Sequence, residues 1–226
     1  MPPRKTAPRP PLILPPAPDH AHEDAALARL PAGALVCGVD EAGRGPWAGP
    51  VHAGAVVLRP DAIPEGLNDS KKLTARRREA LAAEIKAVAD WAVGVASVEE
   101  IDRLGLGRAA DLAMIRAVEG LPRPPAFALI DGRRVPPGLP CPADWLIKGD
   151  ARAVSIAAAS ILAKTERDAE MDRLALLHPE YGWERNRGYG APAHMEALKR
   201  WGVTPYHRRS FRPIHNILVE ESGATD

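Results

Sequence analysis

The sequence predicts an α/β fold, because short apolar segments typical of strands alternate with longer stretches that have helical spacing. Acidic residues stand at the ends of several strand-like segments, where side chains face a cleft more often than a core. The chain has 226 residues, enough for one large domain with a small appendage. Hydrophobic residues make up 46% of it, charged residues 26% and aromatic residues 4%, a profile typical of soluble globular proteins.

Residues 1–31 are predicted to be a disordered, proline-rich tail. Prolines recur at a density that prevents regular helix or strand until the short stretch Asp24–Leu30. The basic Arg4, Lys5 and Arg9 could contact a phosphate backbone, but a solvated extension without function is the favoured interpretation.

Five segments are predicted to be strands, because they are short, apolar and bounded by turn residues. In chain order they are Ala34–Val39, Val51–Leu58, Trp91–Ala96, Ala126–Ile130 and Trp145–Ile147. The first two flank the glycine-rich stretch Gly43–Gly49, so a hairpin is the simplest connection between them. The fourth ends at Asp131-Gly132, which suits a strand that runs into a turn.

Helices are predicted where apolar residues recur with helical spacing. Thr74 is a candidate cap for a helix that continues to Ala89. Ser97 with Glu100 resembles a capping box, which opens a helix through about Val118. The segment Val154–Leu177, rich in alanine at its start, is predicted to be a long and largely buried helix.

We expect a main domain over residues 32–178, a small helical lobe over 179–216 and a tail over 217–226. After His178-Pro179 the composition shifts towards arginine, glycine and tyrosine. In this part Ala193–Trp201 is predicted to be a helix, whereas Pro205–Pro213 is irregular and basic.

The net charge of +1 argues against binding to nucleic acid through the charge of the whole chain, since 30 basic residues are nearly cancelled by 29 acidic ones. The segment 181–212 departs from this balance, because it contains only two acidic residues, Glu184 and Glu196. Its basic residues are Arg185, Arg187, Lys199, Arg200, Arg208, Arg209 and Arg212. This local excess predicts a face that binds a duplex.

Cysteine content and hydropathy indicate the cytoplasm. Only Cys37 and Cys141 occur, without C-x-x-C spacing, so neither a disulfide framework nor a zinc site is indicated. No run approaches the roughly 18 apolar residues of a membrane span, and the N-terminus lacks the apolar core of a secretory signal. We therefore expect a cytoplasmic protein with no membrane contact.

Four acidic residues are candidates for chemistry because each follows a predicted strand. Asp40 and Glu41 come directly after the apolar run that ends at Val39. Adjacent side chains of a regular strand point to opposite faces, so both acids are expected to serve one site only if the strand ends or bulges there. For such a pair taken alone, a solvated turn is the favoured alternative.

Repetition of the arrangement reverses that preference. Asp131 again ends an apolar strand, and Asp150 follows Lys148-Gly149 after the last strand. Carboxylates suit hard divalent cations such as Mg²⁺, and two ions about 4 Å apart can activate water and stabilise a leaving oxygen in phosphodiester hydrolysis. The four acids are therefore expected to form one metal site.

The segment V-D-E-A-G-R-G-P-W-A-G-P-V at residues 39–51 resembles the signature of the type 2 ribonucleases H. Further matches follow in the same order and extend the resemblance to roughly residues 36–214. They are Asn68–Leu73, Ile130–Gly132, Lys148–Asp150, Ser155–Lys164, Arg167-Asp168, Gly188–Gly190 and His207–Phe211. Trp47, where the family more often has a smaller aliphatic residue, and Ala191, in place of a common threonine, depart from the pattern.

The resemblance implies a ribonuclease H-like mixed sheet flanked by helices, with a small helical C-terminal lobe that assists substrate binding. It places the family's four catalytic and metal-binding carboxylates on the four acids already selected, Asp40, Glu41, Asp131 and Asp150, and implies Mg²⁺ or Mn²⁺ as cofactor. Asp168 lies four residues after Lys164 on the long helix, and an ion pair or a helix-anchoring role is favoured for it over metal binding.

Residues for substrate binding are expected in three segments. The resemblance places Gly43, Arg44 and Gly45, together with Tyr189, at the ribonucleotide and its 2′-hydroxyl. The residues Ser70, Lys71 and Lys72 offer a hydroxyl and ammonium groups to backbone phosphates. A structural or phosphate-contacting role is favoured for His207 over proton transfer.

The expected function is that of a metal-dependent endoribonuclease. It would cut the RNA strand of RNA–DNA hybrids and single ribonucleotides in duplex DNA, leave a 5′-phosphate and a 3′-hydroxyl, and serve primer removal and ribonucleotide excision. The alternatives are a DNA nuclease of similar architecture and a non-catalytic hybrid-binding module. A monomer is expected, and a contact with a sliding clamp stays open.

Overall fold

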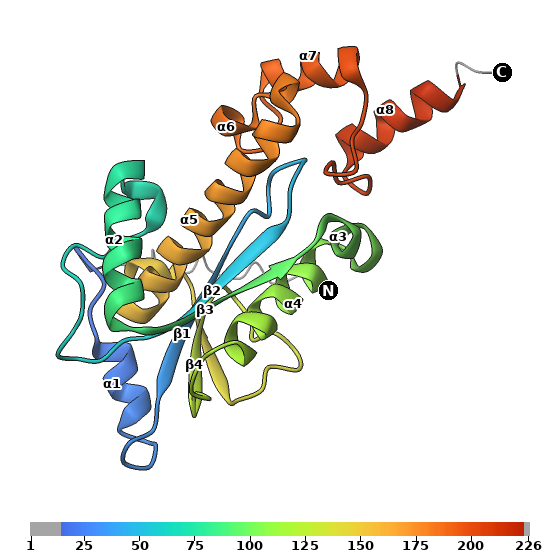
Figure 1. Ribbon diagram of the computed structural model, residues 1–226. Helices are drawn as coiled ribbons and strands as arrows, with labels where there is room; N and C mark the ends of the chain where they lie inside the picture. The colour runs from blue at the N-terminus through green and yellow to red at the C-terminus, as the bar shows by residue number, and fades with distance from the viewer. Residues whose placement is uncertain (1–14, 224–226) are drawn as a thin grey trace, which may run out of the picture.

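The computed structural model describes residues 15–223, with side chains through residue 219, and holds a five-stranded sheet in the order β3-β2-β1-β4-β5 (Figure 1). β1 (Val36–Ala42), β2 (Val51–Val57) and β3 (Asp90–Ala96) are antiparallel neighbours, which confirms the predicted hairpin. β4 (Phe127–Asp131) and β5 (Ala143–Leu146) continue the sheet parallel to β1. The sheet is therefore mixed, as expected.

Helices cover both faces of the sheet (Figure 1). α5 (Val154–Leu177) and α2 (Ala75–Val88) form a hydrophobic cluster with one face. α4 (Leu106–Glu119) packs on the other face, together with the preceding α3 (Val98–Leu104). The sheet therefore has a hydrophobic core on each of its two faces, as an α/β domain needs.

Glycines let α5 lie directly on β1 and β2. A side chain at Gly38 would run into the backbone of Ser155 and Ile156, and one at Gly54 would run into the carbonyl of Ala159. Since helix and strand backbones are in contact here, the position of α5 relative to the sheet is fixed closely.

The N-terminal segment is ordered where the structure describes it. α1 (Ala21–Leu27) buries Ala26 against the sheet, and the buried Glu23 carboxylate accepts hydrogen bonds from Ser155 N (2.8 Å) and Oγ (2.5 Å) at the start of α5. The prediction of a disordered tail is therefore wrong for this part, since the helix docks through contacts distant in sequence. Residues 1–14, with Arg4, Lys5 and Arg9, lie outside the described residues.

The capping box at Ser97 and the length of the helix that follows it were both predicted from the sequence. The capping box is confirmed, because Glu100 N donates to Ser97 Oγ (3.2 Å) and Ser97 N donates to the Glu100 carboxylate (3.0 Å). The single helix expected through Val118 is wrong, because the chain breaks it into α3 and α4 at Gly105, whose φ is 79°. Only glycine adopts that φ freely.

The C-terminal lobe contains η3 (Pro179–Tyr181), α6 (Trp183–Asn186), α7 (Pro192–Trp201) and α8 (Arg212–Gly223). Its aromatic core includes the buried Trp183 and Tyr181, and Ile217 and Leu218 of α8 pack against it. The tail expected from residue 217 is therefore wrong through residue 223, and residues 224–226 lie outside the described part. Within the described residues, no helix is long and apolar enough to cross a membrane.

The contact between Glu23 and α5 generates a stability prediction. Glu23→Ala leaves the first turn of α5 without its acceptor in a buried place, which we expect to lower the free energy of unfolding by about 1–3 kcal/mol. Thermal melting should show a drop of several degrees. Asp24→Ala is the control, because its side chain is 68% exposed and pairs only with His20. Equal melting temperatures for the two variants would contradict the docking role of Glu23.

Candidate active site

The four predicted acids lie at one edge of the sheet. β1, β4 and β5 are parallel, so their carboxyl ends meet at the same edge. Asp40 and Glu41 belong to β1, Asp131 ends β4, and Asp150 lies in η2 (Gly149–Ala151) directly after β5. The Asp131 carboxylate accepts a hydrogen bond from Gly149 N (2.7 Å), which ties the end of β4 to η2.

The strand does not break at the acid pair. β1 runs through Asp40 and Glu41 and pairs with β2 up to Ala42, so the expected strand end or bulge is wrong. Its pairing with β4 stops earlier, at Val39 and Ile130. The pairing ends where the acids begin, and the Asp40 and Glu41 carboxylates both interact with Asp131, although adjacent side chains of a strand point to opposite faces. Asp40 points towards α5, and Glu41 reaches the rim between α5 and α4.

Burial and mutual repulsion favour the protonated forms of these acids. Burial first, and then the Glu41 and Asp131 carboxylates, raise the pKa of Asp40 well above its ordinary value. Burial raises the pKa of Glu41 and of Asp131 as well. Burial, followed by the charges of Asp69 and Asp131, raises the pKa of Asp150 to about 6. The edge therefore collects more negative charge than the protein alone can stabilise at neutral pH.

Lys71 partly offsets this charge. Burial lowers the pKa of its ammonium group, but the surrounding Asp40, Asp69 and Asp150 carboxylates outweigh burial and raise it. Asp69 is an acid that the sequence reasoning passed over, although it precedes the predicted Ser70. It caps η1 (Ser70–Lys72) by accepting a hydrogen bond from Lys71 N (2.9 Å).

The donor set at this edge fits a hard divalent cation. Among the described residues, no three acidic, histidine or cysteine side chains are already closed around one point as ligands. Mg²⁺ does not require such a cage, because it retains several waters and takes one or two carboxylates. Four oxygen-bearing acids that repel one another could therefore hold divalent cations through Asp40, Glu41, Asp131 and Asp150.

A cleft of about 460 Å³ opens beside the acids. Its lining contains the predicted Gly43, Arg44, Gly45, Ser70, Lys71 and Tyr189. Lys72 is the exception among the predicted binding residues, since it is exposed on η1 outside the lining. Ser160, Lys164 and Arg167 of α5 also line the cleft and were missed. Their spacing places them on one helix face, a signal that the sequence offered without showing that the face meets the acids.

Two buried arginines donate hydrogen bonds to backbone carbonyls of the glycine-rich turn. Arg208 donates to the carbonyls of Gly43 (2.6 Å), Arg44 (3.1 Å) and Gly49 (2.9 Å), and burial lowers its pKa to about 9. Arg167 donates to the carbonyls of Ala48, Pro50 and Arg187. The expectation that Arg208 belongs to a duplex-binding face is wrong, because its side chain is fully buried as an anchor for the turn.

Tyr189 stands at the mouth of the cleft, half-exposed and beside Gly45. A side chain added at Gly45 would lie 3.1 Å from Cε1 of the tyrosine ring, so the glycine leaves the ring its place. The Tyr189 carbonyl accepts a hydrogen bond from Nδ1 of His194 (2.9 Å). The next residue, Gly190, lies against Trp47, and the lack of a side chain at Gly190 leaves room for the tryptophan ring.

The histidines behind Tyr189 form a neutral, fixed network. Trp183 Nε1 can only donate, so Nε2 of His194 accepts (3.2 Å) and its Nδ1 carries the proton. Thr204 N donates to Nδ1 of His207 (3.0 Å), whose Nε2 then donates to His194 (3.0 Å). Burial, and after it the proximity of His194, lowers the pKa of His207 to about 3. The structural role favoured for His207 is therefore confirmed.

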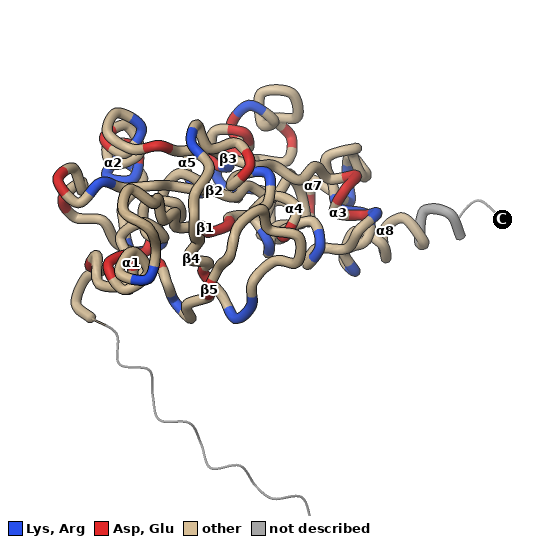
Figure 2. Tube along the Cα trace, turned by 90° about the horizontal axis from the view of Figure 1, so that it is seen from below, with Lys and Arg blue, Asp and Glu red and all other residues tan. Residues whose placement is uncertain are grey.

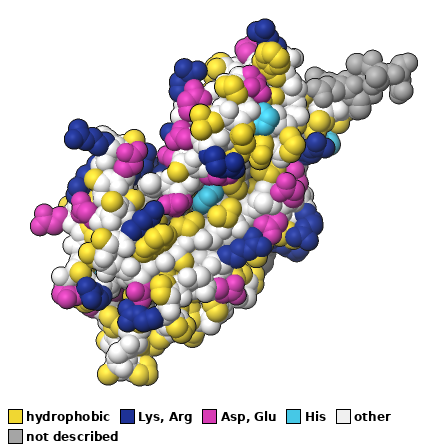
Figure 3. All heavy atoms as spheres, viewed as in Figure 1, with side chains coloured by type: hydrophobic (Ala, Val, Ile, Leu, Met, Phe, Trp, Pro, Cys, Tyr) yellow, Lys and Arg dark blue, Asp and Glu magenta, His cyan; other side chains and the backbone are white. Residues whose placement is uncertain are grey.

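Charged side chains outside the cleft are dispersed. Figure 2 shows acidic positions on β1 and beside β5 near the centre of the trace, with basic residues on the surrounding loops and helices. On the face shown in Figure 3, Lys and Arg side chains are scattered among acidic and apolar ones rather than gathered into one patch. This agrees with the near-zero net charge.

Comparisons with known proteins identify the family. The family model described as Ribonuclease HII matches residues 37–214. The ribonuclease HII of Jannaschia sp. (strain CCS1) is 62% identical over 82% of this chain and 94% of its own length. That of Paracoccus denitrificans (strain Pd 1222) is 60% identical over 92% of this chain and 98% of its own.

Solved structures with the same fold include three ribonucleases. The ribonuclease H2 of Pyrococcus horikoshii OT3 matches with a TM-score of 0.72 and 30% identity, over 85% of this chain and 100% of that one. The Archaeoglobus fulgidus ribonuclease HII, solved in a complex with PCNA, matches with a TM-score of 0.67 and 27% identity, over 79% and 95%. A Bst ribonuclease HIII in complex with Mn²⁺ matches at 0.66 and 20% identity, over 89% and 74%.

The family match covers the acid edge, the glycine-rich turn and Tyr189, and the relatives match along nearly their whole length. The chain therefore belongs to the ribonuclease HII family and is an endoribonuclease that acts on RNA–DNA hybrids.

Proposed function

We propose that Asp40, Glu41, Asp131 and Asp150 hold divalent cations, Mg²⁺ or Mn²⁺, for hydrolysis of a phosphodiester beside a ribonucleotide. The observation that carries this proposal is the set of four carboxylates at one sheet edge, where the protein alone leaves their charges poorly neutralised. Bound divalent cations supply an activated water and stabilise charge on the leaving oxygen. The products carry a 5′-phosphate and a 3′-hydroxyl.

The side chains of the cleft orient the substrate for this step. Lys71 and Ser70 lie close to the acids, where an ammonium group and a hydroxyl can bind the phosphate that is cut and its neighbours. Ser70 is itself fixed, because its Oγ shares a hydrogen bond with Ser160 Oγ of α5 (3.0 Å). A substrate phosphate would therefore meet groups that are already in place, which is how positioning contributes to rate.

Selection of the ribonucleotide is assigned to the glycine-rich turn and Tyr189. Gly43 and Gly45 leave room for the Arg167 side chain and the Tyr189 ring, and Arg208 fixes the carbonyls of the turn. The half-exposed Tyr189 ring can lie against a sugar while its hydroxyl bonds the 2′-OH, the group that distinguishes RNA from DNA. We propose that single ribonucleotides embedded in duplex DNA are cut as well, and that the activity serves primer removal and ribonucleotide excision.

The substitution Asp40→Asn tests the acid site. It keeps the shape and removes one charge, so turnover should fall by roughly a thousandfold or more, the scale of loss when one member of a catalytic set is removed. Duplex binding should survive. Asp144→Asn is the control, because Asp144 is exposed on β5 and its carboxylate accepts only from Trp145 N. Near-normal cleavage by Asp40→Asn with Mg²⁺ would refute the assignment.

Metal binding should also raise the thermal stability of the protein. The raised carboxyl pKa values mean that the folded protein binds more protons than the unfolded chain between about pH 4 and pH 6, so metal-free stability should fall as pH rises through this window. At about pH 7.5, above this window, Mn²⁺ or Mg²⁺ should raise the melting temperature, and at about pH 5 it should raise it less. Asp40→Asn should melt higher than wild type without metal and gain less from it. A metal-induced shift unchanged in Asp40→Asn would place the ion elsewhere.

Tyr189 should matter most for the single ribonucleotide. Sites that hydrogen-bond a substrate hydroxyl can reject analogues lacking it by roughly 10⁴-fold, whereas one stacking contact is worth only about 1–3 kcal/mol. We expect Tyr189→Phe and Tyr189→Ala to lower kcat/KM more on a duplex with one ribonucleotide than on a continuous hybrid. Equal losses on both substrates, with a lowered melting temperature, would leave Tyr189 as a packing residue only.

A further inference from the structure

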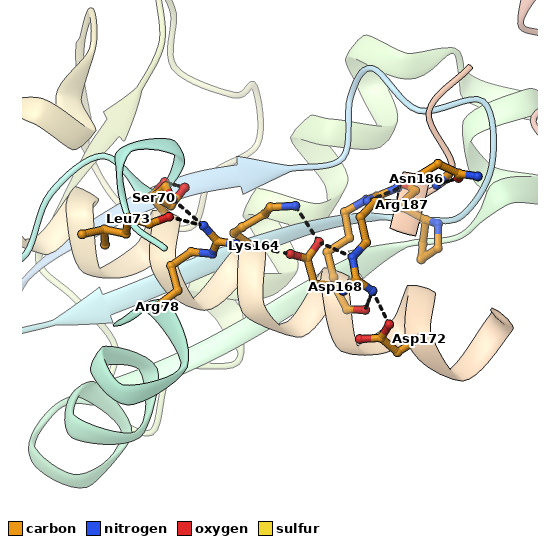
Figure 4. Close-up of polar contacts among 12 residues, drawn as sticks. Ser70, Leu73, Arg78, Lys164, Asp168, Asp172, Asn186 and Arg187 are labelled. Atoms are coloured by element: carbon orange, nitrogen blue, oxygen red, sulfur yellow. Dashed lines mark hydrogen bonds and ion pairs between the residues drawn. The ribbon is translucent and has the colours of Figure 1, made fainter. Parts of the chain in front are cut away.

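Asp168 on α5 is surrounded by cations from three segments of the chain (Figure 4). Its carboxylate lies 2.5 Å from Nζ of Lys164, 3.7 Å from Nη2 of Arg78 and 3.9 Å from Nε of Arg187. The side chain is only 17% exposed, so these charges act on it with less solvent screening than at the open surface. The ion pair that was favoured for Asp168 is thus confirmed. Its carboxylate also has Arg78 and Arg187 as partners, in addition to Lys164.

On one side, Asp168 is connected to the phosphate-binding turn. Arg78 of α2 donates from Nη1 to the carbonyls of Ser70 (2.9 Å) and Leu73 (2.8 Å) while its Nη2 faces Asp168. The arginine therefore spans η1 from Ser70 to the residue after its end, and Asp168 anchors the arginine. Lys71, between those two carbonyls, lines the cleft.

On the other side, Asp168 is connected to the loop that presents Tyr189. Arg187 has the left-handed φ of 52°, which a non-glycine residue adopts only when its surroundings hold it. Its side chain donates to the backbone carbonyl of Asp168 (3.1 Å) and to the carboxylate of Asp172. Its own carbonyl accepts from Arg167 (3.1 Å). Tyr189 follows two residues later.

Lys164 lies between the two connections. It is one helical turn before Asp168 and lines the cleft together with Ser70, Lys71 and Tyr189. In Figure 4, Ser70, Leu73 and Arg78 stand at one end of the cluster, Asn186 and Arg187 stand at the other, and Lys164 and Asp168 lie between them.

We infer that Asp168 is a positioning residue, which sets the η1 turn, Lys164 and the Arg187–Tyr189 loop in one arrangement around the substrate. The inference rests on the proposed function, since it concerns the segments that bind the nucleic acid. Asp168 itself does not line the cleft, so it acts through Arg78, Lys164 and Arg187.

Charge and position predict opposite effects on binding. Removal of a negative charge next to a polyanion ligand strengthens binding if the acid only offsets its basic neighbours. If Asp168 positions those neighbours, its removal weakens binding in spite of the gain in positive charge. The substitution Asp168→Asn therefore separates the two roles by the sign of the change.

The experiment measures binding without metal and cleavage with metal. Fluorescence anisotropy in EDTA gives Kd for a DNA duplex with one ribonucleotide and for the same duplex without it, and steady-state kinetics with Mg²⁺ gives kcat and KM. Glu170→Gln is the matched control, because it removes the same charge two residues further along α5 from a carboxylate that pairs with Arg173 of the same helix. Arg78→Lys keeps the charge but cannot bond both carbonyls and Asp168 in the same way.

We expect Asp168→Asn to raise KM for the single-ribonucleotide duplex about tenfold and to leave kcat within about threefold, since small displacements of positioning groups cost up to roughly a hundredfold. Its Kd for that duplex should rise, and the ratio of the two Kd values should move towards one. Arg78→Lys should change KM in the same direction, whereas Glu170→Gln should bind as tightly as wild type or more tightly.

Tighter binding by Asp168→Asn with an unchanged Kd ratio, or equal effects of Asp168→Asn and Glu170→Gln, would overturn the inference. If Asp168→Asn is too unstable to assay, a wild-type KM for Arg78→Lys overturns it. Failure of the wild-type protein to cut the duplex with one ribonucleotide would instead contradict the proposed function. The Kd ratios measured in EDTA would still decide the role of Asp168.

Discussion

The direct contact of α5 with β1 and β2 is the constraint on which the rest of the structure depends. Gly38 and Gly54 remove the side chains that would hold helix and sheet apart, so α5 has one position on the sheet. Its first turn is held by Glu23 of α1, its middle presents Ser160 and Lys164 to the cleft, and its second half carries Arg167 and Asp168. Met171, further along, packs into the aromatic lobe that presents Tyr189. One helix thus relates the acid edge, the phosphate-binding turn and the ribonucleotide-binding loop to each other.

The same rigidity keeps like charges together. Carboxylates that repel one another would move apart if their strands could yield, but β1, β4 and β5 are fixed by pairing, and β1 and β4 also by burial on both faces. Burial, and after it this crowding, raises the carboxyl pKa values, and a cation that neutralises the charges would recover that free energy. The stability that the metal-free protein loses at this edge of the sheet is the source of the metal affinity that we propose.

Local patterns in the sequence predicted most elements, whereas contacts distant in sequence decided the rest. The limits of α5 match the helix predicted for Val154–Leu177, because the segment is rich in alanine at its start and free of glycine and proline, and the four acids were found because each follows a strand. The docking of α1 was missed because Glu23 meets a residue 132 positions away, which no local pattern shows. Arg208 was placed on a binding face for the same reason: its charge is visible in the sequence, whereas its burial against the glycine-rich turn is not. The break at Gly105 was overlooked because glycine inside an otherwise helical pattern can be tolerated, as Gly107 is within α4, so glycine alone does not mark the end of a helix.

The central claim is that the fold forces four carboxylates into one cation site, and anomalous scattering from crystals soaked in Mn²⁺ tests it most directly. We predict anomalous peaks in the gap between the ends of β1 and β4 and the η2 turn, within coordination distance of oxygens from Asp40, Glu41, Asp131 and Asp150. Peaks that touch fewer than three of these side chains, or that lie only at other acids such as Asp111 or Asp168, would contradict the account.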